Sequence, residues 1–381
     1  MKAIASWLKV GFYNIVVLLV LLEVASFAAS VTGFRGLNHY TSYYLAIVNR
    51  FRADPLVRRG QWYTEFEDWG TWHREAAVTQ HSSACFSATY RSNDYGARDR
   101  DRPRQSDDER IVVMGDSFIE GWGVSAEERL TDQLESQLET PVLNFGAAFH
   151  TGPLQYEIHY RQIASEFSHD RVIVGLLPAN DFTDNDARYW RQERRREFQS
   201  RYRPYYDNTE EGYSALYPVP KPDGDRQMQA NEVEEMTLDG FLYNNTWSYY
   251  VFKRLGKLQG DRSIAREYSG YADAERRQIR PVLSSLEQIQ QTAEAQGATL
   301  TLVLIPAIDD FARQTPGEPL TIQPIFRRFA RQNDIQLIDL LEEMPKVEPD
   351  YRSYYHACDR HWSPYGNQVA AEAIAQRLAN Q

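Results

Sequence analysis

The 381 residues of the chain are enough for one large α/β domain with extra segments or for two modest domains. The composition, 42% hydrophobic and 25% charged, is that of a globular protein and excludes a low-complexity or fibrous chain. The 42 Lys and Arg against 53 Asp and Glu give a formal net charge of −11, which argues against nucleic acid as a partner because the field of the protein would repel phosphate.

The chain has two cysteines, Cys85 and Cys358. Two are too few for a disulfide-rich scaffold, but an even number in an oxidising compartment is compatible with a single bridge. Pairing depends on the distance between the two Cα atoms, which the sequence does not give. A disulfide between them and two separate cysteines therefore both remain open.

The amino terminus carries an apolar run from Val10 to Val31, preceded by Lys2 and Lys9. The run is about as long as the ~20 residues that cross a bilayer. Positive charge before it predicts that residues 1–9 stay in the cytoplasm and that residues 10–31 form a single transmembrane anchor in the inner membrane. The body of the protein would then be periplasmic or extracellular. The alternatives are a cleaved signal peptide, with small residues at 26–28, and a buried core helix.

The rest of the chain divides into a spacer and a longer region with regular periodicity. Residues 32–107 are predicted to be a spacer and loop-rich region, because they lack sustained periodicity. From residue 108 to residue 381, short apolar runs alternate with helical patterns. The predicted strands cover 111–114, 142–145, 171–177, 300–305 and 336–338. The predicted helices cover 125–138, 154–167, 273–296, 325–332 and a closing segment that Ser363 caps and Pro364 begins.

Five strands separated by helices indicate an α/β fold with a doubly wound, parallel five-stranded sheet flanked by helices, as in flavodoxin-like proteins. The segment from about 186 to 270 interrupts the alternation and is rich in Tyr, Arg, Pro and acidic residues. We interpret it as an insertion near the site.

A candidate nucleophile follows the first predicted strand, in the run Met114-Gly115-Asp116-Ser117-Phe118. Ser117 stands where a doubly wound sheet places its ligands, at the carboxyl edge. The run is not the G-x-S-x-G elbow of ordinary α/β-hydrolases, because Ile119 occupies the position of the second glycine. The alternative is that Gly-Asp-Ser serves only as a turn and helix cap.

A candidate base lies just before the closing helix, where Asp359 and His361 are two residues apart. In an extended loop this spacing directs both side chains to the same side, so the carboxylate can orient the imidazole while its other nitrogen faces a serine. A serine hydroxyl needs such a base to become nucleophilic. The alternative is an ordinary surface loop.

Two further residues follow predicted strands and could stabilise an oxyanion. Gly146 follows the second strand and Asn180 follows the third. With the backbone N–H of Ser117, the Gly146 N–H and the Asn180 amide would lie at the same sheet edge and could meet developing negative charge. Gly and Asn are also common in loops, which is the alternative.

A metal centre is a weaker interpretation of the same carboxyl-terminal segment. His356, Cys358, Asp359 and His361 are all competent metal ligands. No second ligand cluster is visible in the sequence, and the triad uses two of the four. We therefore expect no metal and no organic cofactor.

The order of these residues resembles the SGNH/GDSL hydrolase family over about residues 110–381. Gly-Asp-Ser-Phe looks like the first family block, Gly146 the second, Asn180-Asp181 the third and Asp359-Arg360-His361 the last. The chain departs from the family pattern at Pro178, where glycine is common, and in having one residue between Asp359 and His361 where many members have two. The D-x-H-W form followed by Pro-x-Gly resembles membrane-anchored bacterial members and acetyl-transferring relatives that act on exopolysaccharides.

The resemblance implies a serine esterase that hydrolyses or transfers a small acyl group, for example acetyl on an envelope glycan, through an acyl-enzyme. Ser117, His361 and Asp359 would form the triad, and the partner would be an acyl-ester substrate, either glycan or lipid. The alternatives are a polysaccharide O-acetyltransferase and a non-catalytic glycan-binding envelope protein. The sequence leaves the oligomeric state open.

Overall fold

The structure is a computed structural model that describes residues 2–31, 62–66, 69–83, 85–195, 198, 201–209, 212–218, 238, 242, 245–252, 268–315, 317–356 and 359–379. The chain divides into two compact units. The helical unit consists of Met1–Ala53, Ser82–Cys85 and Asn231–Glu267, and the sheet unit consists of Asp54–His81, Phe86–Ala230 and Tyr268–Gln381.

The sheet unit is built on five parallel strands, which confirms the predicted fold class. The strands are β5 (Ile111–Gly115), β6 (Val142–Gly146), β7 (Arg171–Leu176), β10 (Thr299–Leu304) and β11 (Gln336–Asp339). Their order in the sheet is β11-β10-β7-β5-β6, and every neighbouring pair is parallel. The chain first winds outward from β5 to β6 and then crosses to β7, so the direction of winding reverses at β5. A doubly wound sheet places its ligands at this point, outside the carboxyl ends of the strands.

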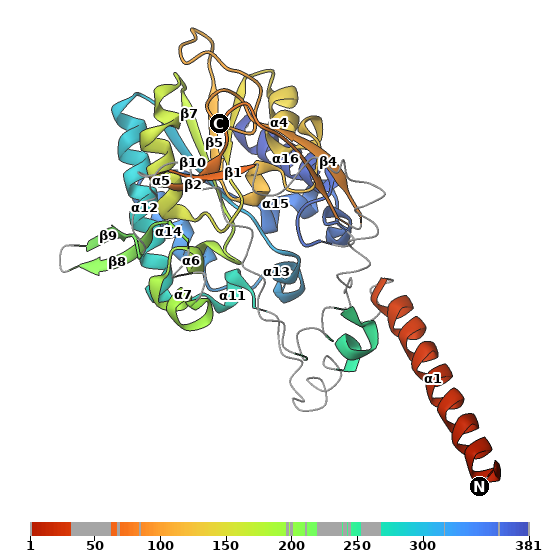
Figure 1. Cartoon of the computed structure of the whole chain (residues 1–381). Helices are drawn as coiled ribbons and strands as arrows, with labels where there is room; N and C mark the ends of the chain where they lie inside the picture. The colour runs from red at the N-terminus through yellow and green to blue at the C-terminus, as the bar shows by residue number, and fades with distance from the viewer. Residues whose placement is uncertain are drawn as a thin grey trace. The chain divides into compact units, whose positions relative to one another are not determined.

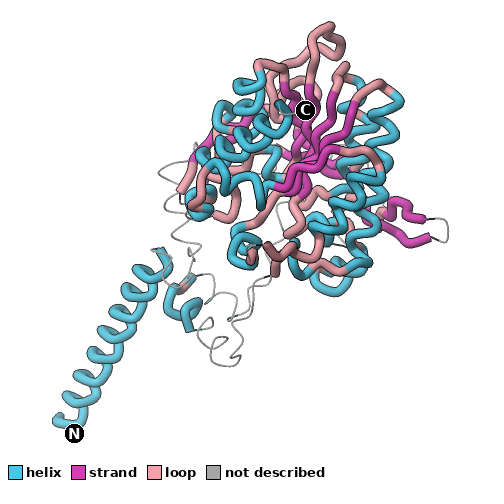
Figure 2. The backbone as a smooth tube through the Cα atoms, turned by 180° about the vertical axis from the view of Figure 1, so that it is seen from behind, coloured by secondary structure: helices cyan, strands magenta, loops and turns pink. Residues whose placement is uncertain are grey.

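Helices cover both faces of the sheet, as Figures 1 and 2 show. On one face α4 (Leu130–Leu138) packs with α16 (Pro364–Ala379), and α15 (Leu340–Val347) packs against α16. On the other face α5 (Pro153–Gln162) packs with α12 (Arg276–Ala295). Further helices are α11 (Gly270–Asp273), α13 (Ile308–Arg313) and α14 (Gln323–Gln332). The β-branched runs of β5 and β7 are buried between these layers, as expected for central parallel strands.

Helix boundaries differ from the sequence prediction where polar caps intervene. Ser125 and Glu128 form the predicted capping interaction, with Ser125 N–H donating to Glu128 Oε2 at 3.0 Å, but they cap a 3₁₀ turn over Ala126–Glu128. Arg129 is extended, with φ −71° and ψ 152°, and α4 therefore begins only at Leu130. The predicted helix over 154–167 ends at Gln162, and a separate 3₁₀ turn follows.

The region predicted to be spacer and loop-rich contains four short strands. These are β1 (Tyr63–Phe66) with β2 (Gly70–His73), and β3 (Val78–Ser82) with β4 (Ser87–Arg91). Trp62, Tyr63 and Tyr90 from this region are buried together with Ala148, which lies just beyond β6. The predicted insertion contains α7 (Ala187–Glu193) and an antiparallel hairpin of β8 (Tyr205–Thr209) and β9 (Gly212–Leu216).

The helical unit contains α1 (Lys2–Val31), which includes the predicted anchor. The stretch Lys9–Ser30 is long and apolar enough to cross a membrane, and a signal sequence would share these properties. Glu23 interrupts the apolar run, and its carboxylate accepts the backbone N–H groups of Trp247 at 2.7 Å and Ser248 at 3.0 Å. The ring of Phe27 lies edge-on to Trp247, with centroids 4.8 Å apart. Residues from the predicted insertion therefore pack against the end of α1.

Candidate active site

Ser117 is the first residue of α3 (Ser117–Glu120), and Asp116 alone separates it from the end of β5, which lies between β7 and β6. Asp116 caps this helix, because its Oδ1 accepts the backbone N–H of Phe118 at 3.0 Å. The backbone N–H of Ser117 itself lies at the first helical position, where an N–H has no partner within the helix. The strand, cap and helix start thus present both the hydroxyl and an N–H at the carboxyl edge of the sheet.

The structure brings Ser117, His361 and Asp359 into one hydrogen-bonded chain. Ser117 Oγ lies 2.8 Å from His361 Nε2, although the two residues are 244 positions apart. His361 Nδ1 lies 2.5 Å from Asp359 Oδ1, which also accepts the His361 backbone N–H at 3.0 Å. This is the geometry that a nucleophile, a general base and an orienting carboxylate require.

Asp359 is held as a carboxylate by its neighbours. Burial opposes its ionisation, but the hydrogen bonds and charge of His361, with the indole of Trp122, lower the pKa of Asp359 to about 2. The charged form can stabilise an imidazolium on His361 when that ring takes a proton. The electrostatics therefore fit a base that cycles between neutral and protonated forms.

Asn180 also reaches this edge, immediately before α6 (Asp181–Asp184). Its Nδ2 donates to Asp116 Oδ2 at 3.3 Å, so its amide is tied to the residue that precedes Ser117. Burial raises the pKa of Asp116 to about 6, although the Phe118 N–H, His361 and Asn180 act in the opposite direction. The structure thus places the predicted amide beside the start of α3.

Gly146 is at the end of β6, opposite Gly115 of β5, but its backbone N–H is already engaged. That N–H donates to Asn144 Oδ1 at 2.9 Å in this structure, and its role toward an oxyanion stays a prediction. Close packing against α3 explains why position 146 is a glycine. A Cβ at position 146 would lie 2.3 Å from the backbone nitrogen of Glu120, and only glycine lets β6 approach α3 this closely.

Sequence reasoning missed a buried carboxylate next to the site. Glu120, the last residue of α3, is fully buried and accepts hydrogen bonds from Trp62 Nε1 at 3.0 Å and Tyr63 OH at 2.9 Å. It also accepts the backbone N–H of Ala148, and its Oε1 lies 3.4 Å from His73 Nε2. The only signal in the sequence is a charged residue on the helix that starts at Ser117, and its partners lie far away along the chain.

The metal alternative and the disulfide have different outcomes. Among the described residues no three His, Cys, Asp or Glu side chains are grouped so that they could hold a metal ion. Cys85 is disulfide-bonded. Cys358 lies outside the described residues, so the pairing of Cys85 with Cys358 stays a prediction.

Comparison with known proteins gives a partial family match. Residues 265–381 match the family model for the SGNH hydrolase-like domain, acetyltransferase AlgX. No curated protein sequence matches the chain.

Several solved structures are similar to this chain at low identity. One is a member of the lipolytic protein G-D-S-L family from Veillonella parvula, with 11% identity, a TM-score of 0.38, and coverage of 72% of this chain and 100% of that chain. Another is the lipase/acylhydrolase from Enterococcus faecalis, with 14% identity, a TM-score of 0.37, and coverage of 71% and 96%. A third is a psychrotrophic esterase from Pseudoalteromonas, with 9% identity, a TM-score of 0.35, and coverage of 72% and 98%.

The matched model supports an acyl hydrolase or acetyltransferase activity for this chain. The matched residues include Asp359 and His361. Ser117, Gly146 and Asn180 lie before the match, at the carboxyl ends of β5, β6 and β7. The carboxyl-terminal part of the chain, residues 265–381, is thus similar to an SGNH hydrolase-like domain, and the five-stranded parallel sheet agrees with the SGNH/GDSL-like fold that the sequence predicts.

Proposed function

We propose that this protein is an extracytoplasmic serine enzyme that removes or transfers a small acyl group from an ester, with Ser117 as nucleophile. The observation that carries the proposal is the chain of contacts from Ser117 Oγ to His361 Nε2 at 2.8 Å and from His361 Nδ1 to Asp359 at 2.5 Å. The family model names an acetyltransferase, so acetyl is the acyl group that we favour. An envelope glycan is the substrate class that we favour.

In the first half of the reaction, His361 Nε2 takes the proton of the Ser117 hydroxyl, and Oγ bonds to the ester carbonyl carbon. The carbonyl oxygen becomes an oxyanion, which the backbone N–H of Ser117 and the side-chain amide of Asn180 stabilise. When this intermediate collapses, the bond to the alcohol oxygen breaks and the alcohol leaves with the proton from His361. Ser117 is then acylated.

In the second half, an incoming hydroxyl gives its proton to His361 and attacks the acyl carbon. The bond to Ser117 Oγ breaks, and Oγ regains a proton from His361 Nε2. If the hydroxyl belongs to water, the product is the free acid and the enzyme is an esterase. If it belongs to a sugar, the product is a new ester and the enzyme is an acyltransferase.

Labelling with a fluorophosphonate probe tests the nucleophile directly. We expect the full chain to be labelled, and we expect Ser117→Ala and His361→Ala to abolish labelling. Ser165→Ala is the matched control. Ser165 lies on the 3₁₀ turn Ala164–Glu166, and its hydroxyl donates a hydrogen bond to the carbonyl oxygen of Arg161 and to none of the triad residues. An unlabelled wild-type chain would favour the alternative of a non-catalytic glycan-binding protein.

Acetate release and acetyl transfer separate the two reaction types. The full chain is supplied with p-nitrophenyl acetate, with and without an acetyl-free envelope polysaccharide. Acetylated polysaccharide that depends on Ser117 would identify a transferase, and free acetate alone would identify an esterase.

The location is tested by protease treatment of spheroplasts. We propose that α1 anchors the chain in the inner membrane and that the sheet unit lies outside the cytoplasm, which is supported by the apolar stretch Lys9–Ser30. Digestion of the sheet unit in intact spheroplasts is expected. Protection until lysis would contradict this location, and a mature chain that starts after residue 28 would indicate a cleaved signal peptide.

A further inference from the structure

Trp122 contacts each of the three proposed triad residues. Its backbone N–H donates to the carbonyl oxygen of Ser117 at 2.9 Å. Its indole Nε1–H donates to Asp359 Oδ2 at 3.3 Å. Its ring is stacked on the imidazole of His361, with centroids 5.2 Å apart and planes at 27°. One residue therefore links the nucleophile, the base and the orienting carboxylate.

The backbone that carries Trp122 is fixed to α3. The helix ends at Glu120 and is capped by Gly121, which has φ 85°. The N–H groups of Gly121 and Trp122 both donate to the Ser117 carbonyl. This is the usual way in which a left-handed glycine closes a helix. The position of the indole is consequently set relative to the residue that carries the nucleophile.

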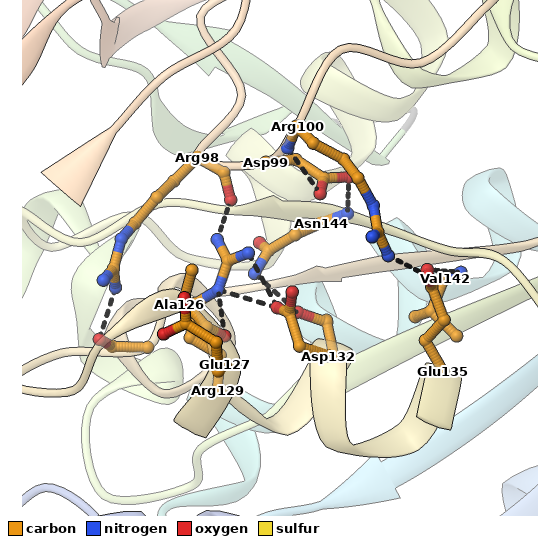
Figure 3. A network of polar contacts seen from close by, with 12 residues as sticks. Arg98, Asp99, Arg100, Ala126, Glu127, Arg129, Asp132, Glu135, Val142 and Asn144 are labelled. Carbon is orange, nitrogen blue, oxygen red and sulfur yellow. Dashed lines mark hydrogen bonds and ion pairs between the residues drawn. The ribbon is translucent and has the colours of Figure 1, made fainter. Parts of the chain in front are cut away.

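Arg98 holds the same turn from outside the helix. Its guanidinium donates to the carbonyl oxygens of Glu120 at 2.7 Å and Val124 at 2.6 Å, and also to that of Gly121. Arg98 is 1% exposed, and its backbone carbonyl accepts from Arg129, as Figure 3 shows. A buried guanidinium whose donors are used on one turn restricts the movement of that turn, because each broken bond would leave a buried polar group unpaired.

The indole itself is supported by the β3 and β4 strands. The ring of His81 lies edge-on to Trp122, with centroids 4.2 Å apart. His81 Nδ1 lies 2.7 Å from the hydroxyl of Tyr90, and that hydroxyl also accepts the backbone N–H of Gly123 at 2.7 Å. The hairpin thus holds both the ring of Trp122 and the turn on which it sits.

The indole N–H of Trp122 is one of three N–H groups that donate to the Asp359 carboxylate. Oδ1 takes the ring and backbone N–H groups of His361, and Oδ2 takes the indole N–H of Trp122. A carboxylate with both oxygens engaged by fixed donors cannot rotate freely. Its orientation then sets the plane of the imidazole and the direction in which Nε2 faces Ser117.

We infer that Trp122 is a positioning residue of the triad, whose indole N–H fixes the Asp359 carboxylate and whose ring fixes the plane of the His361 imidazole. This inference rests on the proposed function of Ser117, His361 and Asp359. It adds a fourth residue to the machinery, and Trp122 acts through the other three without touching the acyl group.

The test is Trp122→Phe, which keeps an aromatic ring against His361 and removes the N–H donor. The matched control is Trp72→Phe, because Trp72 is a buried indole whose N–H donates to Tyr95 O at 2.9 Å, at a distance from the triad contacts. Two quantities are measured on the full chain in detergent. They are the rate of fluorophosphonate labelling and the downfield NMR resonance of the His361 Nδ1–H proton.

We expect Trp122→Phe to be labelled roughly ten- to a hundredfold more slowly than wild type, the loss typical of one hydrogen bond to a charged acceptor. We also expect its Nδ1–H resonance to shift, and Trp72→Phe to keep both the wild-type rate and the wild-type resonance. A wild-type rate and resonance in Trp122→Phe would overturn the inference. Equal losses in Trp72→Phe would also overturn it, because they would indicate general loosening of the fold.

The resonance needs no substrate, which separates this inference from the proposed function. If the wild-type chain is not labelled but its Nδ1–H resonance shifts only in Trp122→Phe, the proposed function fails while the positioning role of Trp122 stands. If the wild-type chain is labelled and the resonance does not respond to Trp122→Phe, the proposed function stands and the positioning role fails.

Discussion

The hydroxyl of Tyr63 donates to Glu120 Oε2 at 2.9 Å, and this bond joins the first strand of the sheet unit to the helix that begins at Ser117. Both side chains are buried, and Glu120 is fully so. A buried carboxylate is tolerated only when donors surround it. The amino-terminal strands are therefore part of the support of the site.

Replacement of Glu120 by Gln is expected to destabilise the fold at neutral pH. Burial opposes the charge, but His73, Arg98 and Trp62 outweigh it and lower the pKa of Glu120 to about 2 from its ordinary value of 4.5. The stabilisation by the carboxylate is complete above pH 4.5 and is lost as the pH falls toward 2. We expect Glu120→Gln to lose about 3 kcal/mol at pH 7 and the difference from wild type to narrow below pH 4.5.

Urea denaturation of the full chain at pH 7 and pH 3 measures this difference. Glu166→Gln is the control, because Glu166 pairs with Arg104 at the surface and should change stability by no more than about 0.5 kcal/mol. A Glu120→Gln variant as stable as wild type at pH 7 would show that the buried carboxylate does not support the fold.

His159 makes the fold sensitive to mild acid. It is 1% exposed, and burial, with the charge of His73, lowers its pKa from 6.5 to about 3. The unfolded chain takes up this proton at higher pH than the folded chain does. The contribution of His159 to stability is therefore complete above pH 6.5 and falls by about 1.4 kcal/mol per pH unit below it, until the pH reaches 3.

His159→Leu is expected to remove this dependence. Between pH 7 and pH 5 the free energy of unfolding of wild type should fall by about 2 kcal/mol more than that of His159→Leu. Urea denaturation at pH 7 and pH 5 measures these free energies. The difference in the free energy of unfolding between wild type and His159→Leu should be the same at pH 8 as at pH 7. Parallel losses in the two proteins would mean that His159 is protonated in the fold.

Gly146→Ala is expected to disturb both stability and activity. The new Cβ would lie 2.3 Å from Glu120 N and 2.5 Å from the carbonyl carbon of Ile119, so the backbone of α3 must shift. Overpacking of this kind costs about 1–3 kcal/mol. Because α3 starts at Ser117, we also expect slower fluorophosphonate labelling.

Gly297→Ala provides the contrast for Gly146→Ala. Gly297 has φ 81° with open space around its Cβ position, so alanine there should cost about 1 kcal/mol of backbone strain and leave labelling unchanged. Thermal denaturation and labelling rates of both variants measure the difference. Full activity in Gly146→Ala would show that the close approach of β6 to α3 is not needed for the site.

Asn180→Ala tests the proposed oxyanion donor. We expect kcat for p-nitrophenyl acetate to fall by about 10²–10³ with little change in KM, because the amide acts on charge that develops in the transition state. Asn333→Ala is the control, since the Asn333 amide donates to Phe329 O at the end of α14. Wild-type kcat in Asn180→Ala would leave the amide with a purely structural role toward Asp116.

Much of this site was predictable because it depends on short-range patterns. The apolar runs of β5, β6 and β7 each end at a polar or glycine block, and parallel strands bring such blocks to one edge. The Asp359 and His361 pair was predictable from its spacing, since side chains two residues apart in an extended loop point to the same side. Local spacing thus located Ser117, Asn180 and the pair without any knowledge of long-range contacts.

The role of Gly146 could not be judged in this way. The sequence predicts that Gly146 lies at the end of a strand, and this position alone suggested that its N–H could stabilise an oxyanion. In the structure the Gly146 N–H donates to Asn144 Oδ1, and the backbone of α3 occupies the space that a side chain at position 146 would need. Which neighbour takes an N–H depends on the packing of β6 against another element, and local patterns do not contain that information.

The fold class, the order of the site blocks and the apolar amino-terminal helix were predictable from the sequence, because hydrophobic periodicity and turn residues act over a few positions. The three-dimensional packing was needed to find that Trp122 touches all three proposed triad residues and that Trp62, Tyr63 and His73 surround Glu120. Apart from the contact of Trp122 with Ser117, these contacts join residues between 47 and 239 positions apart. They arise from the crossing of strands and helices in space, and each of the residues involved looks unremarkable in its own stretch of sequence.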